Sequence, residues 1–149
     1  MLSYRICRAE YAADLKASGS AGRWNHDGQW ILYSSATRSL AALEMLARRS
    51  GQFLNNPYKV MVLEVPVDSC QLLLPESLPD HWKQISSFGH LREIGAEWYR
   101  RSESLVLSVP SVLIPQERNY LINTQHPDFG EMIRLVEVEE FDWDGRLVL

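Results

Sequence analysis

The stretch from residue 22 to residue 51, GRWNHDGQWILYSSATRSLAALEMLARRSG, constrains the fold more than any other part of the chain. It begins as a glycine-rich loop, continues into an apolar strand at residues 29–35, and then takes helical spacing over residues 37–51. Thr37 or Ser35 would cap this helix at its start, and arginines followed by a glycine would end it. Loop, buried strand and helix are thus predicted to follow one another directly.

Other apolar runs, several with alternating polar residues, predict strands on both sides of this unit. They lie at residues 2–8, 58–67 and 104–113, as a short strand in the loop 118–129, and as two strands that turn at Asp144-Gly145. Helices are expected at 12–16 and 90–102, and irregular structure at 18–28 and 72–82. Strands that outnumber the long helices inserted between them predict one α+β domain over residues 1–149, with a mainly antiparallel sheet.

The charge distribution argues against direct binding to nucleic acid or to membranes. The chain of 149 residues has a formal net charge of −4, and its basic residues form only two short pairs, Arg48-Arg49 and Arg100-Arg101. A protein that follows phosphate groups usually presents a basic face. No run approaches the roughly 18 consecutive apolar residues of a membrane span, and the charged start is unlike a signal peptide. We therefore expect a cytoplasmic protein.

Neither the cysteines nor the histidines have the spacing of a metal site. Cys7 and Cys70 lie in apolar, strand-like contexts, which favours buried and reduced thiols, while a disulfide between them stays open. The four histidines are scattered along the chain, so we expect no metal ion.

Glu44 lies in the predicted helix beside apolar residues that recur every three or four positions. Leu40, Leu43 and Ala47 form a stripe, and Glu44 sits on its shoulder, four positions after Leu40. A carboxylate at that place is partly desolvated and suited to the edge of a cleft. Arg48, four positions further on, would instead make a surface ion pair with Glu44. Spacing alone favours the ion pair, because most glutamates on helices are solvated.

Three further residues have both a chemical and a structural interpretation. Arg23, in the glycine-rich loop, would bind a pyrophosphate with its guanidinium fork or stack on Trp24. Tyr33, at the end of its strand, would present its ring to a flat ligand or belong to the core. Ser111 would bond a ligand or satisfy a turn. No histidine is placed as its general base, so serine-hydrolase chemistry is poorly supported.

Taken together, the motifs GRWN, YSSATRSLAALE and VPSVLIPQERNYLINTQHP resemble the RES domain family, named for Arg, Glu and Ser. The resemblance covers nearly the whole chain and includes YRICR near the start and HLREIGAEWY before the last motif. It implies a fold similar to that of ADP-ribosyltransferases and an activity that consumes NAD⁺. RES proteins are toxins of bacterial type II toxin–antitoxin pairs, and their partners are Xre-type antitoxins.

The resemblance also implies roles for particular residues. The arginine, tyrosine, glutamate and serine of the family fall on Arg23, Tyr33, Glu44 and Ser111. Three residues match positions near the site and are expected to contact the nucleotide: Arg5, Asn119 and Asn123. The sequence departs from the family at Thr124, where a proline often follows the second asparagine, and this bears on the shape of that loop.

The implied chemistry is cleavage of the nicotinamide–ribose bond by water or phosphate, which depletes NAD⁺ and arrests growth. Glu44 would stabilise the positive charge that develops on the ribose. Arg23 would neutralise the pyrophosphate, Tyr33 would stack on the nicotinamide or ribose, and Ser111 would bond the nucleotide or orient Glu44. Transfer of ADP-ribose to a protein and a non-catalytic binding module stay open as alternatives. The resemblance further implies a helix-turn-helix antitoxin that blocks the cleft and a homodimer within the toxin–antitoxin complex.

Overall fold

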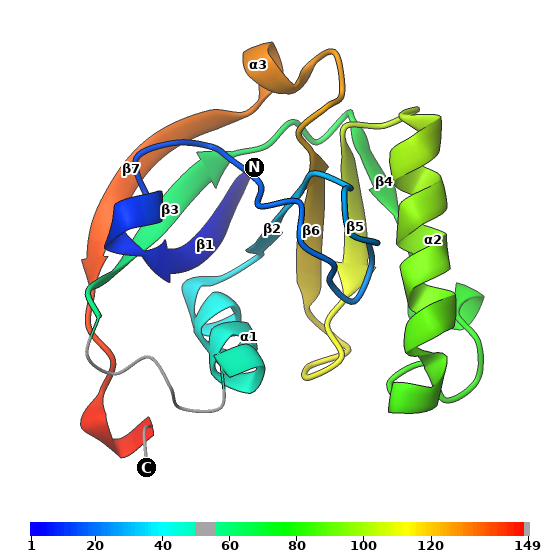
Figure 1. The fold of residues 1–149 in the computed structure, drawn as a ribbon, viewed down its shortest axis with the longest axis horizontal. Coiled ribbons are helices and arrows are strands. Elements are labelled where there is room, and N and C mark those ends of the chain that lie inside the picture. Colours follow the sequence, from blue (N-terminus) through cyan, green and yellow to red (C-terminus); the bar gives the residue numbers. More distant parts are fainter. Residues whose placement is uncertain (50–55, 148–149) are drawn as a thin grey trace.

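Seven strands form one sheet in the computed structural model, which describes residues 1–49 and 56–147. Their order across the sheet is β4-β5-β6-β2-β1-β3-β7 (Figure 1). Their bounds are β1 (Leu2–Arg8), β2 (Ile31–Ser35), β3 (Tyr58–Glu64), β4 (Cys70–Leu72), β5 (Val106–Pro110), β6 (Arg118–Asn123) and β7 (Arg134–Phe141). Neighbouring strands are antiparallel, except that β4 and β5 run parallel. The predicted α+β class with a mainly antiparallel sheet is confirmed.

Two long helices pack on the same face of the sheet (Figure 1). α1 (Arg38–Arg49) covers β1 and β3, and α2 (Phe88–Arg101) covers β5 and β6. Tyr4 and Ser35 lie opposite each other where β1 pairs with β2, so their side chains point to the same face of the sheet. The apolar side chains beneath α1 and those beneath α2 lie on that face. The part of the sheet between the two helices is β2.

The opposite face of the sheet has its own apolar cluster. Segments around η1 (Ala9–Tyr11) and α3 (Phe129–Met132) cover this cluster, which includes Leu32, Met61 and Ile122. The other short helices are η2 (Pro75–Ser77), η3 (Ile85–Ser87) and η4 (Gly145–Leu147). The sheet is therefore buried on both faces along its central strands.

The start of α1 agrees with the sequence. Thr37 Oγ1 accepts a hydrogen bond from the Leu40 amide at 3.1 Å, which confirms Thr37 as the capping residue. The cap satisfies one of the amides that have no partner within the helix. The predicted end at Gly51 lies outside the described residues.

The buried side of α1 differs from the predicted apolar stripe. Leu40 is buried, but Leu43 and Ala47 are exposed, so the stripe is wrong at two of its three positions. The helix instead buries Ala41 next to Leu40, because Ala41 packs against the aromatic and aliphatic side chains of β1 and β3. This rotation places Glu44 on the side that faces the sheet.

Two predictions in the first and last thirds of the chain are corrected by tertiary contacts. No helix forms at residues 12–16; a 3₁₀ turn at η1 comes just before, because five residues make too few hydrogen bonds for a helix. The segment 118–129, predicted to be mostly loop, contributes β6, which pairs along five residues with β2 and along five with β5. Pairing on both sides outweighs weak local propensity.

The predicted irregular segment and the predicted final hairpin are also corrected in part. β4 extends to residue 72 as a parallel edge strand, just before the prolines of the irregular segment. After β7 the chain forms η4 in place of a turn between two strands, because Asp144 accepts hydrogen bonds from the amide and guanidinium of Arg146. Residues 148–149 lie outside the described part of the chain.

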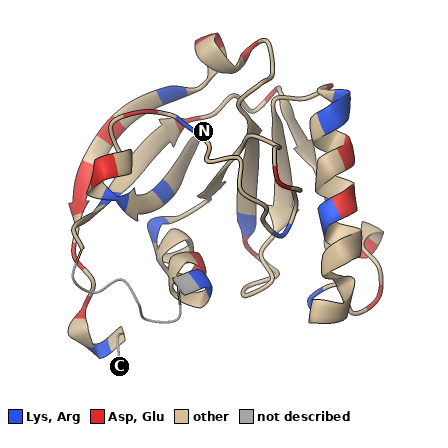
Figure 2. Ribbon diagram, in the orientation of Figure 1, with Lys and Arg blue, Asp and Glu red and all other residues tan. Residues whose placement is uncertain are grey.

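Charged residues mark the edge strand β7 and the helix α2. Acidic residues line the edge strand β7, and both signs alternate along α2 (Figure 2). Charged side chains on an edge strand oppose pairing with another sheet.

Cys7 is buried, Cys70 is half-buried, and both are free thiols. Among the described residues, no helix is long and apolar enough to cross a membrane.

Candidate functional site

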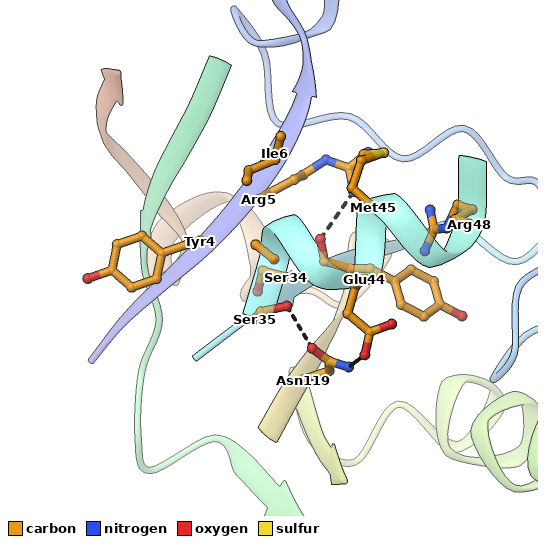
Figure 3. Close-up of a pocket in the computed structure, with 11 residues that line it drawn as sticks. Tyr4, Arg5, Ile6, Ser34, Ser35, Glu44, Met45, Arg48 and Asn119 are labelled. Carbon is orange, nitrogen blue, oxygen red and sulfur yellow. Dashed lines mark hydrogen bonds between the residues drawn. The ribbon is translucent and has the colours of Figure 1, made fainter. Parts of the chain in front are cut away.

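A pocket opens where β1 and β2 separate (Figure 3). These strands are in register only at Tyr4 and Ser35. Beyond that pair, Arg5 Nη1 donates a hydrogen bond to the Tyr33 carbonyl at 3.1 Å, so a side chain joins the strands in place of a backbone ladder. Strands β1, β2 and β6 and helix α1 all line the pocket. The sheet is therefore split at its centre, next to the carboxylate of Glu44.

Glu44 is bound through one of its two carboxylate oxygens. Ser111 Oγ and Asn119 Nδ2 each donate a hydrogen bond to Oε1 at 2.7 Å. Within residues 1–49 and 56–147, Oε2 accepts no hydrogen bond, and Glu44 forms no ion pair with Arg48. The surface ion pair that spacing favoured is therefore wrong. Glu44 lines the pocket with one oxygen fixed and the other available (Figure 3).

The two donors to Glu44 are themselves fixed in orientation. Ser111 is fully buried, and its Oγ accepts hydrogen bonds from the amides of Leu113 and Ile114, so its proton points to the carboxylate. Asn119 Oδ1 accepts a hydrogen bond from Ser35 Oγ at 2.6 Å. This bond sets the amide of Asn119 with its nitrogen toward Glu44. The carboxylate is thus held by a connected polar network.

Arg23 lies close to the pocket with part of its guanidinium unpaired. Its Cζ atom lies 4.2 Å from the centre of the Phe88 ring, so the arginine stacks on α2 and not on Trp24. Nη1 is buried without a hydrogen-bond partner in the described part of the chain. Burial lowers the pKa of Arg23, and the nearby charge of Glu44 opposes that shift. A buried donor without an acceptor is costly, and an anionic ligand would supply one.

The loop that carries Arg23 is docked on α2. Arg92 Nε donates a hydrogen bond to the Gly22 carbonyl at 3.1 Å. The Trp24 carbonyl lies so close to Gly95 that a Cβ atom there would be 1.9 Å from its oxygen. Contact this close requires glycine at position 95. The second helix therefore positions the loop, although it contributes no residue to the pocket wall.

Tyr33 combines the two predicted interpretations. Its ring lines the pocket, while its hydroxyl donates to Asn25 Oδ1 at 2.5 Å and accepts from the Trp24 amide at 3.4 Å. Burial raises the pKa of Tyr33 to about 12, against weaker opposing effects of the Trp24 amide and nearby arginines. The phenol is therefore neutral at physiological pH, and only its ring is available to a ligand.

Of the three further predicted residues, the structure brings Arg5 and Asn119 to the pocket but not Asn123. Asn123 lies at the opposite end of β6, in register with Ile31. Its Nδ2 donates to the Tyr99 carbonyl at 3.4 Å, and its Oδ1 accepts from the Gln125 amide at 2.9 Å. These contacts tie β6 to the end of α2.

Two residues of the pocket wall have a different role in the sequence prediction: Ser35, a candidate helix cap, and Arg48, a candidate surface partner of Glu44. Ser35 lies two positions after Tyr33 and so shares its side of the strand. Arg48 lies four positions after Glu44 and shares its side of the helix. Both spacings were available signals. Among the described residues, no group of three or more His, Cys, Asp or Glu side chains could hold a metal ion.

The chain is similar in sequence to two toxins along nearly its whole length. The chain is 32% identical over 151 residues to the Toxin Res of Yersinia enterocolitica serotype O:8, covering 99% of each protein. It is 34% identical over 148 residues to the Prs ADP-ribosylating toxin of Sphingobium sp. strain YBL2, covering 95% of this chain and 91% of that one.

A solved structure shares the fold. A chain of the M. tuberculosis MbcT–MbcA toxin–antitoxin complex superposes with a TM-score of 0.75 at 15% identity, over 95% of this chain and 84% of that chain. Residues 2–144 match the family profile of the RES domain. The match spans both the split in the sheet and the loop of Arg23. This chain therefore belongs to the RES domain family.

Proposed function

We propose that this protein is the toxin of a toxin–antitoxin pair and that it consumes NAD⁺ by cleaving the nicotinamide–ribose bond. The observation that carries the proposal is the Glu44 carboxylate, held through one oxygen by Ser111 and Asn119 and exposed to the pocket through the other. Membership of the RES family and the name Toxin Res of a relative that matches over its full length support it.

The reaction requires a stabiliser of positive charge at the ribose. As the bond to nicotinamide breaks, its electron pair leaves on the nicotinamide nitrogen, and positive charge develops on the sugar. A preorganised carboxylate stabilises that charge more than water does, because it need not reorient. Oε2 of Glu44 is the oxygen available for this role. Nicotinamide leaves as a neutral molecule, so no acid has to protonate it.

Tyr33 in the pocket wall and Arg23 close to it are suited to holding the dinucleotide. Arg23, whose Nη1 is buried and unpaired in the described residues, would bind the diphosphate. The ring of Tyr33 would stack on the nicotinamide or on the adjacent ribose. Water or inorganic phosphate would add to the ribose carbon and release a proton to solvent, giving ADP-ribose or its 1″-phosphate.

A second acceptor is a protein side chain. The relative from Sphingobium is named an ADP-ribosylating toxin, which supports transfer of ADP-ribose to a protein by the same site. NAD⁺ labelled on its adenylate distinguishes the products. Label fixed on protein supports transfer, whereas free ADP-ribose or its phosphate supports hydrolysis or phosphorolysis.

We further propose an antitoxin partner of the Xre type that covers the pocket through its C-terminal part, with two copies of this chain in the complex. The structural relative comes from a toxin–antitoxin complex, which supports the partner. DNA binding would belong to the helix-turn-helix of the antitoxin, in keeping with the net charge of −4 of this chain.

Substitution of Glu44 tests the proposal. In purified Glu44→Gln and Glu44→Ala proteins, we expect NAD⁺ consumption to fall roughly thirtyfold or more, since one preorganised electrostatic group contributes about 2 kcal/mol or more. The matched control is Glu97→Gln, because Glu97 pairs with arginines on the exposed side of α2. Timed NAD⁺ measurement and circular dichroism would be recorded for each.

Undiminished turnover by a folded Glu44→Gln protein would contradict the assignment. A wild-type protein that binds nucleotide without consuming NAD⁺ would favour a binding module instead. The position of Glu44 argues against that module, because a pyrophosphate binder gains nothing from a nearby carboxylate.

A further inference from the structure

We propose that Arg48, together with Arg5, forms a second anion-binding position that contacts the diphosphate of the dinucleotide in addition to Arg23. The inference rests on the proposed function for the identity of the ligand. The proposal gives Arg48 a role in binding, in place of the surface ion pair with Glu44 that the sequence spacing favoured.

Both arginines line the pocket, Arg5 half-buried and Arg48 more exposed, and neither has a carboxylate partner among the described residues. Arg5 forms one hydrogen bond in the described part of the chain, to the Tyr33 carbonyl, and a carbonyl does not neutralise its charge. The Cζ atom of Arg48 lies 5.9 Å from the centre of the Tyr33 ring. Among residues 1–49 and 56–147, Arg48 makes no hydrogen bond or ion pair.

The two cations are close enough to oppose each other. Burial lowers the pKa of Arg5 most, and the charge of Arg48 lowers it further. Like charges that converge on a half-buried pocket cost free energy unless an anion lies between them. The guanidinium fork is suited to phosphate oxygens, which it binds with two parallel hydrogen bonds.

The charges around the pocket fit a diphosphate. Arg5 and Arg48 in the pocket wall and Arg23 nearby carry three positive charges, whereas Glu44 carries one negative charge. The diphosphate of a bound dinucleotide adds two negative charges and brings the sum of these groups to zero, apart from the single positive charge of the nicotinamide ring. Because Glu44 would face the ribose next to the diphosphate, one ligand can contact the carboxylate and the arginines together.

A different explanation for Arg48 is its place in the last turn of α1, where a cation interacts favourably with the helix dipole. That role predicts an effect on helix stability and none on ligand affinity. The two explanations therefore differ in what a substitution at position 48 changes.

The experiment uses the purified complete protein with the substitution Arg48→Gln. We expect the KM for NAD⁺ to rise about tenfold while kcat stays within about twofold, because the contact is made equally in the bound and the transition states. The dissociation constant of ADP-ribose should weaken similarly, and that of adenosine, which has no phosphate, should not change. Arg48→Lys should give an intermediate KM, because it keeps the charge and loses the fork.

The matched control is Arg101→Gln, which removes the same charge from an arginine paired with Glu97 on α2, outside the pocket. An unchanged KM in Arg48→Gln would overturn the inference, as would an equal loss of affinity for adenosine and ADP-ribose. If the wild type does not consume NAD⁺, the proposed function fails, and the affinities for ADP-ribose and adenosine still decide the role of Arg48.

Discussion

Three polar side chains from separate parts of the chain orient the Glu44 carboxylate. Ser111 and Asn119 bond it directly, and Ser35 acts through Asn119. In the described part of the chain both hydrogen bonds to Glu44 reach the same carboxylate oxygen, Oε1, so the two oxygens have different surroundings. An asymmetric carboxylate can present a defined oxygen to a ligand, whereas a freely rotating one spends part of its time misdirected.

The Ser35–Asn119 pair gives a prediction about coupling. We expect Asn119→Ala to lower kcat about tenfold, because a hydrogen bond to a charged group contributes about 1.5–3 kcal/mol. Ser35→Ala should lower kcat less, about threefold, since it acts only through the amide of Asn119. In the Asn119→Ala background, Ser35→Ala should have no further effect on kcat. Steady-state kinetics of the four proteins of this cycle would measure it, and additive losses would show that Ser35 acts independently.

At the scale of elements, the loop of Arg23 depends on a helix that contributes nothing to the pocket wall. α2 holds this loop through Arg92 and through the close packing of Trp24 on Gly95. Hydrogen bonds within the loop, among them those from Asn25 Nδ2 to the carbonyls of Ser20, His26 and Gln29, hold its shape, and α2 sets where the loop lies. Substrate affinity is therefore expected to respond to changes on α2.

Gly95→Ala tests this dependence. A methyl group there would clash with the Trp24 carbonyl, so the loop must shift, and we expect a KM for NAD⁺ raised several-fold and a stability loss of about 1–3 kcal/mol. The control is Gly89→Ala in the same helix, where an added Cβ meets nothing within 4 Å. That change should stabilise the protein by up to about 1 kcal/mol and leave KM unaltered. Urea unfolding and kinetics would measure both, and equal behaviour of the two variants would contradict loop positioning by α2.

At the scale of the whole molecule, the split sheet and the two helices enclose Tyr33 on several sides. Tyr33 belongs to the centre of the sheet, packs beside the α2 cluster and lines the pocket. Its buried hydroxyl is held by the loop that carries Arg23. Ionisation of this phenol would place a charge in the interior, so the stability of the whole fold is linked to its protonation.

This linkage predicts a loss of stability at high pH. Burial raises the pKa of Tyr33 from 10.0 to about 12. Below pH 10 the phenol is protonated in both states, and between pH 10 and 12 the unfolded chain ionises while the folded chain does not. Ionisation of Tyr33 in the unfolded chain should therefore lower the free energy of unfolding by roughly 3 kcal/mol over this range. Urea unfolding of wild type and Tyr33→Phe would measure it; parallel curves for the two proteins would contradict the prediction.

Much of the local structure could be predicted because its determinants lie close together in the sequence. Thr37 caps α1 through an amide three positions away, and β1 and β3 follow from their apolar runs. The full length of β6 could not be predicted from the sequence, because its extended conformation depends on pairing with β2 and β5 on either side. The prediction of a final hairpin is wrong for a local reason, because hydrogen bonds between Asp144 and Arg146 stabilise a 3₁₀ turn there.

The sequence by itself determined the fold class, the start of α1 and, through its resemblance to a family, several residues that line the pocket, among them Glu44 and Tyr33. Only the tertiary structure decided that Glu44 faces inward, which of its oxygens is bonded, and that Arg48 lines the same pocket. The physical reason is distance along the chain. The donors to Glu44 lie 67 and 75 positions away, so their placement depends on where distant strands return to the sheet. Periodicity within one helix carries no information about that return.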